Sequence, residues 1–228
     1  MAGRVTGART EPLRIGVLVG QHGRGSNMLA LIDACKNGRI DGEVVTVVGS
    51  DARAPALDRA RSSETPVTVV PGGGDSDYGQ RLLGALRSAR VDLICLAGYM
   101  RLLPEIVVEE FRWRAMNVHP ALLPKFGGKG MFGRRVHEAV IAAGENETGC
   151  TVHFVDDQYD HGPIILQARV PVLPGDTPET LAARILPLEH ETYVRAVELF
   201  RAGLTVVDGE VVRVHGACAD FERRMTDA

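Results

Sequence analysis

Two polar side chains stand two positions apart at the end of an apolar run, in the stretch 115–126, AMNVHPALLPKF. Residues two apart in a strand face the same way, so Asn117 and His119 should point together. Pro120 removes a backbone donor and favours the end of the strand at this point. Either side chain alone fits a satisfied structural polar group as well as a functional one. An amide and an imidazole together at a strand end favour a functional site.

A partner for this pair is expected in the segment 153–163, HFVDDQYDHGP, which contains Asp156, Asp160 and a further aspartate. Carboxylates before a glycine are commonly turn formers exposed to solvent. A metal site built from these carboxylates with His119 and His161 is the alternative. No H-x-x-x-H or comparable ligand spacing occurs, so we expect no metal.

A glycine-rich loop follows the first apolar run, in GQHGRGSNM at 20–28. Ser26 or Asn27 is expected to cap the helix after it, which would leave backbone N–H groups and the helix dipole facing a bound anion. The spacing matches neither the dinucleotide fingerprint nor the P-loop. A phosphate-ended small molecule and a tight turn without a ligand both remain open.

The remaining pattern predicts the elements that position these loops. Short β-branched runs predict strands at 13–19, 43–49, 66–70, 91–97, 115–119, 151–156 and 162–172. Helices are expected at 26–37, 54–62, 104–111, 136–143 and 177–201, with Asp176 or Thr177 capping the last. Asp75 or Ser76 could cap a further helix after the third strand. Residues 204–214 predict a hairpin on Asp208–Gly209.

Alternating strands and helices indicate an α/β fold, a Rossmann-like, mostly parallel sheet with helices on both faces and a C-terminal hairpin. Ligands bind at the carboxyl ends of the strands in such folds. We expect a flexible N-terminus at 1–12, one domain at 13–214 and a tail at 215–228.

Composition narrows the class of partner. The chain has 228 residues, 45% of them hydrophobic, a formal net charge of -3 and a pI near 6.2. Nothing in this balance favours a nucleic acid or an anionic membrane. The four cysteines form no C-x-x-C pair and no signal peptide precedes the first strand, so we expect reduced thiols in a cytoplasmic protein.

Four segments together resemble the motifs of the phosphoribosylglycinamide formyltransferases, folate-dependent enzymes of purine (IMP) synthesis. They are GRGSNM, GYMRLL, NVHPALLPKF and HFVDDQYDHGPIILQ, and the resemblance runs from about residue 13 to 214. The N-x-H-P-x-L-L-P segment marks the wider folate formyltransferase superfamily. The G-S-N after the first strand and the E-H of PLEHETY indicate this member.

The resemblance implies formyl transfer from the co-substrate 10-formyltetrahydrofolate to the amine of glycinamide ribonucleotide, without a metal. The catalytic residues would be Asn117, His119 and Asp160. The ribonucleotide would be bound by Gly25, Ser26, Asn27 and Glu189. The folate would be bound by Met100, Arg101, Leu102, Leu103, Asn117, Val155, Asp156 and Asp160. A monomer or homodimer is expected.

The implied chemistry passes through a tetrahedral oxyanion. The side-chain amide of Asn117 and a ring N–H of His119 would donate to that oxygen, which is worth roughly 10²–10³ in rate for each donor. Asp160 would favour the imidazolium of His119 and raise its pKa.

The sequence departs from the family pattern in three places. The first loop, GQHGRGSN, has an extra residue. The arginine that contacts folate after the third strand finds no match in GGGDSDYGQRL, where Asp77 is nearest. The loop Gly127–Arg135 is longer than in many members.

Other functions remain as alternatives. A formyltetrahydrofolate deformylase would usually carry an N-terminal regulatory domain, and a methionyl-tRNA formyltransferase would need a second domain and a basic face. Another amine formyltransferase, acting on a sugar nucleotide, explains the G-S-N loop less well. A non-catalytic nucleotide-binding module would have no need of the three catalytic residues.

Overall fold

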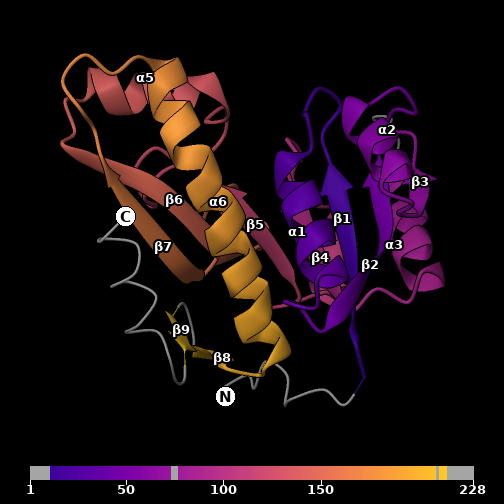
Figure 1. The fold of residues 1–228 in the computed structure, drawn as a ribbon. Coiled ribbons are helices and arrows are strands. Elements are labelled where there is room, and N and C mark those ends of the chain that lie inside the picture. Colours follow the sequence, from indigo (N-terminus) through magenta and orange to yellow (C-terminus); the bar gives the residue numbers. More distant parts are fainter. Residues whose placement is uncertain (1–10, 73–76, 209–210, 215–228) are drawn as a thin grey trace. The chain divides into compact units, whose positions relative to one another are not determined.

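The structure, a computed structural model, describes residues 11–72, 77–208 and 211–214. Seven strands form the main sheet in the order β3-β2-β1-β4-β5-β6-β7 (Figure 1). Their bounds are β1 Leu13–Val19, β2 Gly42–Gly49, β3 Val67–Val69, β4 Leu93–Ala97, β5 Ala115–His119, β6 Glu147–Phe154 and β7 Ile164–Pro171.

Strand direction confirms the expected, mostly parallel sheet. The pairs β1–β2, β1–β4, β2–β3 and β4–β5 are parallel, whereas β6 and β7 are antiparallel. A separate antiparallel pair, β8 (Thr205–Asp208) and β9 (Val211–Val214), forms the expected hairpin. Gly209 of its turn lies outside the described residues. All five residues of β4 are buried, as expected for a strand inside a parallel sheet.

The described part of the chain contains six helices. They are α1 Ser26–Lys36, α2 Pro55–Ser62, α3 Tyr78–Ser88, α4 Glu105–Glu110, α5 Arg134–Ala142 and α6 Pro178–Arg201. Thr177 caps α6 as expected, because its side chain accepts a hydrogen bond from the backbone N–H of Thr180 at 3.3 Å. No helix within the described residues is long and apolar enough to span a membrane.

Several helix starts differ from the sequence prediction. The cap of α3 is Asp77, and the expected caps Asp75 and Ser76 lie outside the described residues. Pro104 is the cap of α4 and not part of its first turn. Helix α5 begins at Arg134, inside the predicted glycine-rich loop, and this arginine pairs one turn ahead with Glu138 at 2.6 Å.

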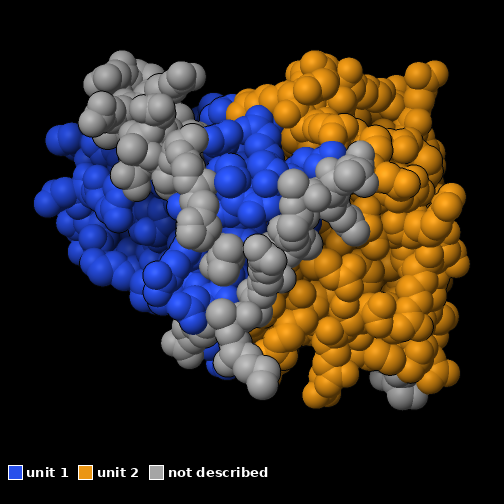
Figure 2. Space-filling model, turned by 90° about the horizontal axis from the view of Figure 1, so that it is seen from below, with its two compact units in different colours: residues 1–8, 118–154, 158–228 blue, residues 9–117, 155–157 orange. Residues whose placement is uncertain are grey.

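The chain divides into two compact units (Figure 2). Unit 2 comprises residues 9–117 and 155–157. Its core joins α3 and α4 to the sheet through buried side chains such as Leu82, Ile94 and Val107. These aliphatic side chains supply the hydrophobic stabilisation that fixes β1 and β4, whose ends carry the first candidate loops.

Unit 1 contains the described residues 118–154, 158–208 and 211–214. Helix α6 packs on both β6 and β7 (Figure 1). The core beneath it contains Val140 from α5, Cys150 from β6, Ala168 from β7 and Ile185 from α6. Strand β6 is buried over seven of its eight residues, so a polar side chain on it needs a partner.

Candidate active site

The two polar side chains of the opening motif lie at the end of β5, as predicted. Strand β5 has the predicted bounds, and Asn117 lies opposite Leu96 of β4 in the parallel pairing. Asn117 is half-buried and His119 is only 3% exposed. Asn117 is the last residue of β5 in unit 2, and His119 belongs to unit 1.

Asp160 lies beside His119 within unit 1. The distance from Asp160 Oδ2 to His119 Nδ1 is 3.5 Å. The Gly128 N–H also donates to Oδ2, at 3.0 Å. The backbone of Asp160 has a φ of 52°, which a residue other than glycine seldom adopts. Left-handed backbone of this kind is often found at functional sites.

Both ring nitrogens of His119 face acceptor atoms of the protein. Besides the contact of Nδ1 with Asp160, Nε2 lies 2.8 Å from the carbonyl oxygen of Phe126. A carbonyl oxygen only accepts, so Nε2 carries a hydrogen. In this structure the Nε2–H of His119 is engaged by the Phe126 carbonyl, so it would have to exchange this acceptor for the oxygen of a substrate in order to donate to an oxyanion.

Burial dominates the electrostatics of His119. It lowers the pKa of the imidazole below the usual value, while Asp160 and the Phe126 carbonyl oppose the effect and His153 adds to it. Asp160 thus acts in the predicted direction, but the net pKa of His119 is lowered and not raised. Burial by itself would raise the pKa of Asp160; the contacts with His153, His119 and Gly128 outweigh it, so this pKa lies below the usual value.

His153 is a site residue that the sequence analysis missed. It is 2% exposed on β6, and its Nε2 lies 3.7 Å from Asp160 Oδ1. The available signal was a histidine inside a strand buried on both faces. No sequence signal marks the contribution of Phe126, because its contact is made by a backbone carbonyl.

A polar scaffold holds the turn after β5. Thr151 on β6 donates from its hydroxyl to the carbonyl of Ala121 at 2.7 Å and accepts from the N–H of Leu123 at 3.0 Å. Gln167 on β7 donates to the carbonyl of Leu123 at 2.9 Å. Two strands therefore fix the path of the backbone that delivers the Phe126 carbonyl to His119.

The long loop Gly127–Arg135 also contributes to this site. Its residue Gly128 supplies the N–H bound by Asp160, and the Met131 N–H donates to the Gly128 carbonyl at 3.1 Å. Gly127 has no room for a side chain, since a Cβ there would lie 2.5 Å from Leu123 Cδ2. The segment is packed against the catalytic candidates as well as extending the loop.

The first loop of unit 2 reaches α1 through a glycine. Gly25, at φ 70°, is the cap of α1, and no side chain makes a capping hydrogen bond there. The expected capping by Ser26 or Asn27 is therefore wrong. Both are in the first turn of α1, so their backbone N–H groups are among those that a helix start leaves without intrahelical partners. A Cβ on Gly25 would lie 2.9 Å from Ala56 Cβ, so the turn is confined to glycine.

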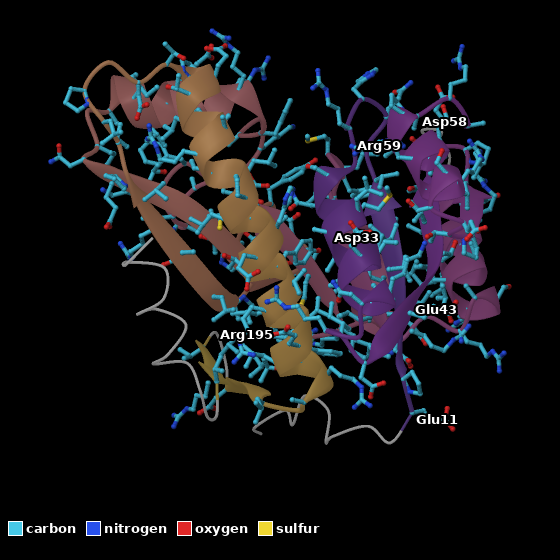
Figure 3. All side chains as sticks on the ribbon, viewed as in Figure 1. Glu11, Asp33, Glu43, Asp58, Arg59 and Arg195 are labelled. Carbon is cyan, nitrogen blue, oxygen red and sulfur yellow. The ribbon has the colours of Figure 1, made fainter. Side chains whose placement is uncertain are left out.

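Side chains around α2 hold the first loop. Arg59, labelled on α2 in Figure 3, donates to the carbonyl of Arg24 at 2.7 Å. Gln21 donates to Asp51 at 3.1 Å, and hydrogen bonds from Arg53 are the main reason that the pKa of Asp51 falls to about 2. No pattern in the sequence indicated that residues after β2 would hold this loop.

Apart from Asp160, the predicted folate-binding residues lie in unit 2, and they differ in exposure. Met100 and Leu102 are 49% and 42% exposed, whereas Leu103 is only 4% exposed and belongs to the core. The side chain of Leu103 therefore presents little surface to a ligand in this structure, and its predicted contact with folate stays a prediction. Val155 donates its N–H to the Ala115 carbonyl at 2.8 Å and packs against the same core. Asp156, next to it, is half-buried.

Arg101 of the same segment lies toward the loop after β3. Its guanidinium carbon is 5.8 Å from the ring centre of Tyr78, and a Cβ on Gly72 would collide with it. The Tyr78 hydroxyl is in turn 3.0 Å from that of Tyr99. A positive charge is therefore present near the position at which the expected family arginine has no counterpart.

Glu189 lies on the buried face of α6 in unit 1, where it is 9% exposed. Its charge adds to the effect of burial on Cys150, whose pKa rises to about 12. That thiol therefore stays protonated at neutral pH. Within the described residues, no group of three histidine, cysteine or acidic side chains is arranged to hold a metal ion.

Comparison with known proteins assigns the chain to one family. Residues 13–197 match the family model described as formyl transferase. The chain is 41% identical over 197 residues to the phosphoribosylglycinamide formyltransferase, chloroplastic, of Arabidopsis thaliana, covering 85% of this chain and 68% of that protein. It is 36% identical over 208 residues to the phosphoribosylglycinamide formyltransferase of Escherichia coli (strain K12), covering 87% of this chain and 96% of that protein.

Solved structures agree with the sequence relatives. The crystal structure of glycinamide ribonucleotide transformylase 1 from Symbiobacterium toebii has a TM-score of 0.83 and 41% identity. The similarity covers 90% of this chain and 95% of that one. The family match at residues 13–197 spans all seven strands of the main sheet and the candidate residues from Gly25 to Glu189.

Proposed function

The chain belongs to the formyl transferase family, and from this premise we propose that it transfers the formyl group of 10-formyltetrahydrofolate to the amine of glycinamide ribonucleotide. The products are the formylated ribonucleotide and tetrahydrofolate. The observation that carries the proposal is the pairing of His119 with Asp160 at 3.5 Å, although they are 41 positions apart in the sequence. The match with this chain covers 96% and 95% of the lengths of two relatives, and the names of both state the corresponding activity.

The amine nitrogen attacks the formyl carbon and forms a new C–N bond, while the carbonyl electrons move to oxygen. Asn117 donates from its side-chain amide to this oxyanion. The Nε2–H of His119 is the second donor, and the formyl oxygen takes the place of the Phe126 carbonyl. That replacement is chemically matched, because both acceptors are carbonyl oxygens and the existing bond is 2.8 Å long.

The second half of the reaction breaks the bond between the formyl carbon and the folate nitrogen. The attacking amine loses one proton and the folate nitrogen gains one, so the balance needs no oxidant or reductant. Asp160 stabilises the imidazolium of His119 against its burial, and this charge stabilises the oxyanion until it collapses.

The remaining site residues bind the two substrates. We assign the ribonucleotide phosphate to the backbone at Gly25, Ser26 and Asn27, because a helix start attracts anions. Glu189 contacts the same substrate. The folate contacts Met100, Arg101 and Leu102, together with Val155 and Asp156.

One assay tests the proposal against its alternatives. The purified chain is mixed with 10-formyltetrahydrofolate, with and without glycinamide ribonucleotide, and release of tetrahydrofolate is followed. Release only with the ribonucleotide, with equimolar formylated product, is expected. Release of tetrahydrofolate in the absence of the ribonucleotide would indicate a deformylase. If neither mixture releases tetrahydrofolate, an enzymatic role for the site is refuted.

The roles within the site are separated by kinetics. Asn117→Ala should lower kcat by roughly 10²–10³ because one oxyanion donor is lost. The KM for the ribonucleotide should change little, since the phosphate loop is untouched. A rise in that KM with an unchanged kcat would place Asn117 in substrate binding instead.

A further inference from the structure

The loop Gly127–Arg135 carries positive charge that neighbouring acidic side chains only partly neutralise. Its sequence, GGKGMFGRR, contains three cationic residues and no acidic one, in a chain with a formal net charge of -3. Arg134 is paired with one acidic residue of α5 and another of α6. Lys129 and Arg135 are both exposed and form no ion pair within the described residues. Two cations of this loop are therefore available to an anion from outside the chain.

The loop is tied to the catalytic candidates of unit 1. Gly128 donates its N–H to Asp160 Oδ2 at 3.0 Å, and the same oxygen lies 3.5 Å from His119 Nδ1. The Met131 N–H donates to the Gly128 carbonyl at 3.1 Å, which closes a turn that contains Lys129. Lys129 thus directly follows the residue that binds the Asp160 carboxylate. Its long, flexible stem lets the ammonium reach a ligand that extends beyond the reacting centre.

The second cation rests on an aromatic ring. The guanidinium carbon of Arg135 lies 5.3 Å from the ring centre of Phe132, and the Phe132 side chain is exposed. Attraction between a cation and an aromatic face restrains the orientation of the guanidinium. The ring accepts no conventional hydrogen bond, so the N–H donors of Arg135 remain available to a planar anion such as a carboxylate.

The position of Arg135 does not favour the stability of α5. Arg135 lies in the first turn of this helix, and that turn contains no acidic residue. Positive side chains are unfavourable there, because the helix dipole has its positive end at the N-terminus. A local arrangement that opposes stability without compensation indicates a role in binding.

We propose that Lys129 and Arg135 form a subsite for the carboxylates of the glutamyl tail of the formyl donor. This subsite depends on the proposed function, which brings a folate to Asp160. In that donor the nitrogen that carries the formyl group is attached to the benzoyl ring, and the same ring carries the tail. A formyl carbon at the reacting centre therefore leaves the tail only one ring and one amide away. The loop whose Gly128 binds Asp160 borders the reacting centre, so it is placed to meet the tail.

The phosphate of the ribonucleotide is the other anion of the proposed reaction. We assign it to the first loop at Gly25, which belongs to unit 2. The two anions make different demands on the loop Gly127–Arg135. A contact with the phosphate would change the KM for the ribonucleotide, whereas a contact with the tail changes the affinity for folate. Each additional glutamate adds one carboxylate, so affinity through this subsite should rise with the length of the tail.

Calorimetry on the whole chain tests the subsite without catalysis. The ligands are tetrahydropteroate, which lacks the tail, then tetrahydrofolate and its γ-linked triglutamate. Lys129→Gln and Arg135→Gln should each weaken binding of the tailed ligands by about 1.4- to 5-fold, the range for exposed ion pairs. Binding of tetrahydropteroate should not change. Salt at about 1 M should remove most of the advantage of the tailed ligands, because exposed charges are then screened within ~3 Å.

Matched controls come from the same segment. Lys125→Gln removes an exposed lysine that is already paired with Glu145 at 2.8 Å. Arg134→Gln removes an arginine that is already paired with acidic side chains. Neither variant should alter the difference in affinity between tailed and tail-less ligands. Lys129→Arg keeps the charge and should retain the binding of the unsubstituted chain.

The outcomes separate this subsite from the proposed function. If none of the three ligands binds, the proposed function is refuted and the subsite with it. Equal affinity for tailed and tail-less ligands, or equal losses in Arg134→Gln and Arg135→Gln, would overturn the subsite and leave formyl transfer standing. A higher KM for the ribonucleotide in Lys129→Gln, with unchanged affinity for folate, would assign the loop to the phosphate instead.

Discussion

Replacing Asp160 by asparagine removes one charge from the site and keeps the shape of the side chain. The asparagine side chain keeps one oxygen, which can accept the hydrogen bond that the Gly128 N–H donates to Asp160 Oδ2 at 3.0 Å in the unsubstituted protein. The contact with His119 Nδ1, which is 3.5 Å long in the unsubstituted protein, loses its ionic character. Because Asp160 opposes the effect of burial on His119, the pKa of this histidine should fall further below its usual value.

The size of the effect follows from the distance. At 3.5 Å, Coulomb's law with an effective dielectric of about 20 gives an attraction of roughly 5 kcal/mol, which is an upper limit for the change. Opposite charges this close shift pKa values by ~1–3 units in practice, which corresponds to ~1.4–4 kcal/mol. If the imidazolium stabilises the oxyanion, kcat should fall by roughly 10- to 1,000-fold.

The assay combines kinetics with NMR. Steady-state formyl transfer should show a lower kcat with the KM for the ribonucleotide nearly unchanged, and the His119 titration should move to lower pH. Asp157→Asn is the matched control, since Asp157 is exposed and only three positions earlier. Near-normal kcat in Asp160→Asn, or equal losses in both variants, would refute the assignment of Asp160.

Three further outcomes are expected. Gly25→Val should raise the KM for the ribonucleotide at least ~10-fold and leave that for folate unchanged, because φ is 70° and Ala56 leaves no room for a Cβ; equal effects on both substrates would contradict the phosphate assignment. Arg59→Ala should raise the same KM by about 3- to 10-fold, since one hydrogen bond of ~0.5–1.5 kcal/mol to the loop is lost, and Arg59→Lys should restore part of it. Burial lowers the pKa of His119 and His137 below the ~6.5 of the unfolded chain. On acidification the unfolded state therefore binds protons before the folded state does. The free energy of unfolding that these neutral rings contribute above about pH 6.5 is consequently lost below that pH. Thermal or urea unfolding should show up to about 1.4 kcal/mol of loss per histidine between about pH 7.5 and 5.5, and a flat profile would show that these rings are not buried as neutral groups.

Local patterns in the sequence were sufficient for most of the elements. Strands β1 and β5 have the predicted bounds, because short, largely apolar runs that end at a glycine or a proline favour strands. The cap of α6 at Thr177 was also predictable, since its partner Thr180 is three residues away. Family motifs then predicted Asn117, His119 and Asp160 as the catalytic residues without any knowledge of distance.

Tertiary structure decided how those groups interact. The approach of Asp160 to His119 depends on the return of the chain through β6, and the second imidazole, His153, comes from that strand. The Phe126 carbonyl that binds His119 belongs to the backbone, which carries no residue-specific signal. Burial reversed the predicted direction of the His119 pKa shift. Desolvation depends on every neighbour of the ring, whereas the sequence motifs predicted only one of these neighbours, Asp160.

The same division applies to the substrate loops. The glycines of the first loop predicted a tight turn. Which of them becomes the cap of α1 depends on packing, because Ala56 of α2 leaves no room for a Cβ at Gly25. Leu103 had the same apolar signal as Leu102, yet one is in the core and the other is exposed. Sequence periodicity determined which segments become strands and helices, because that preference is local; packing decided which side chains remain accessible, because accessibility is a property of all the surrounding atoms.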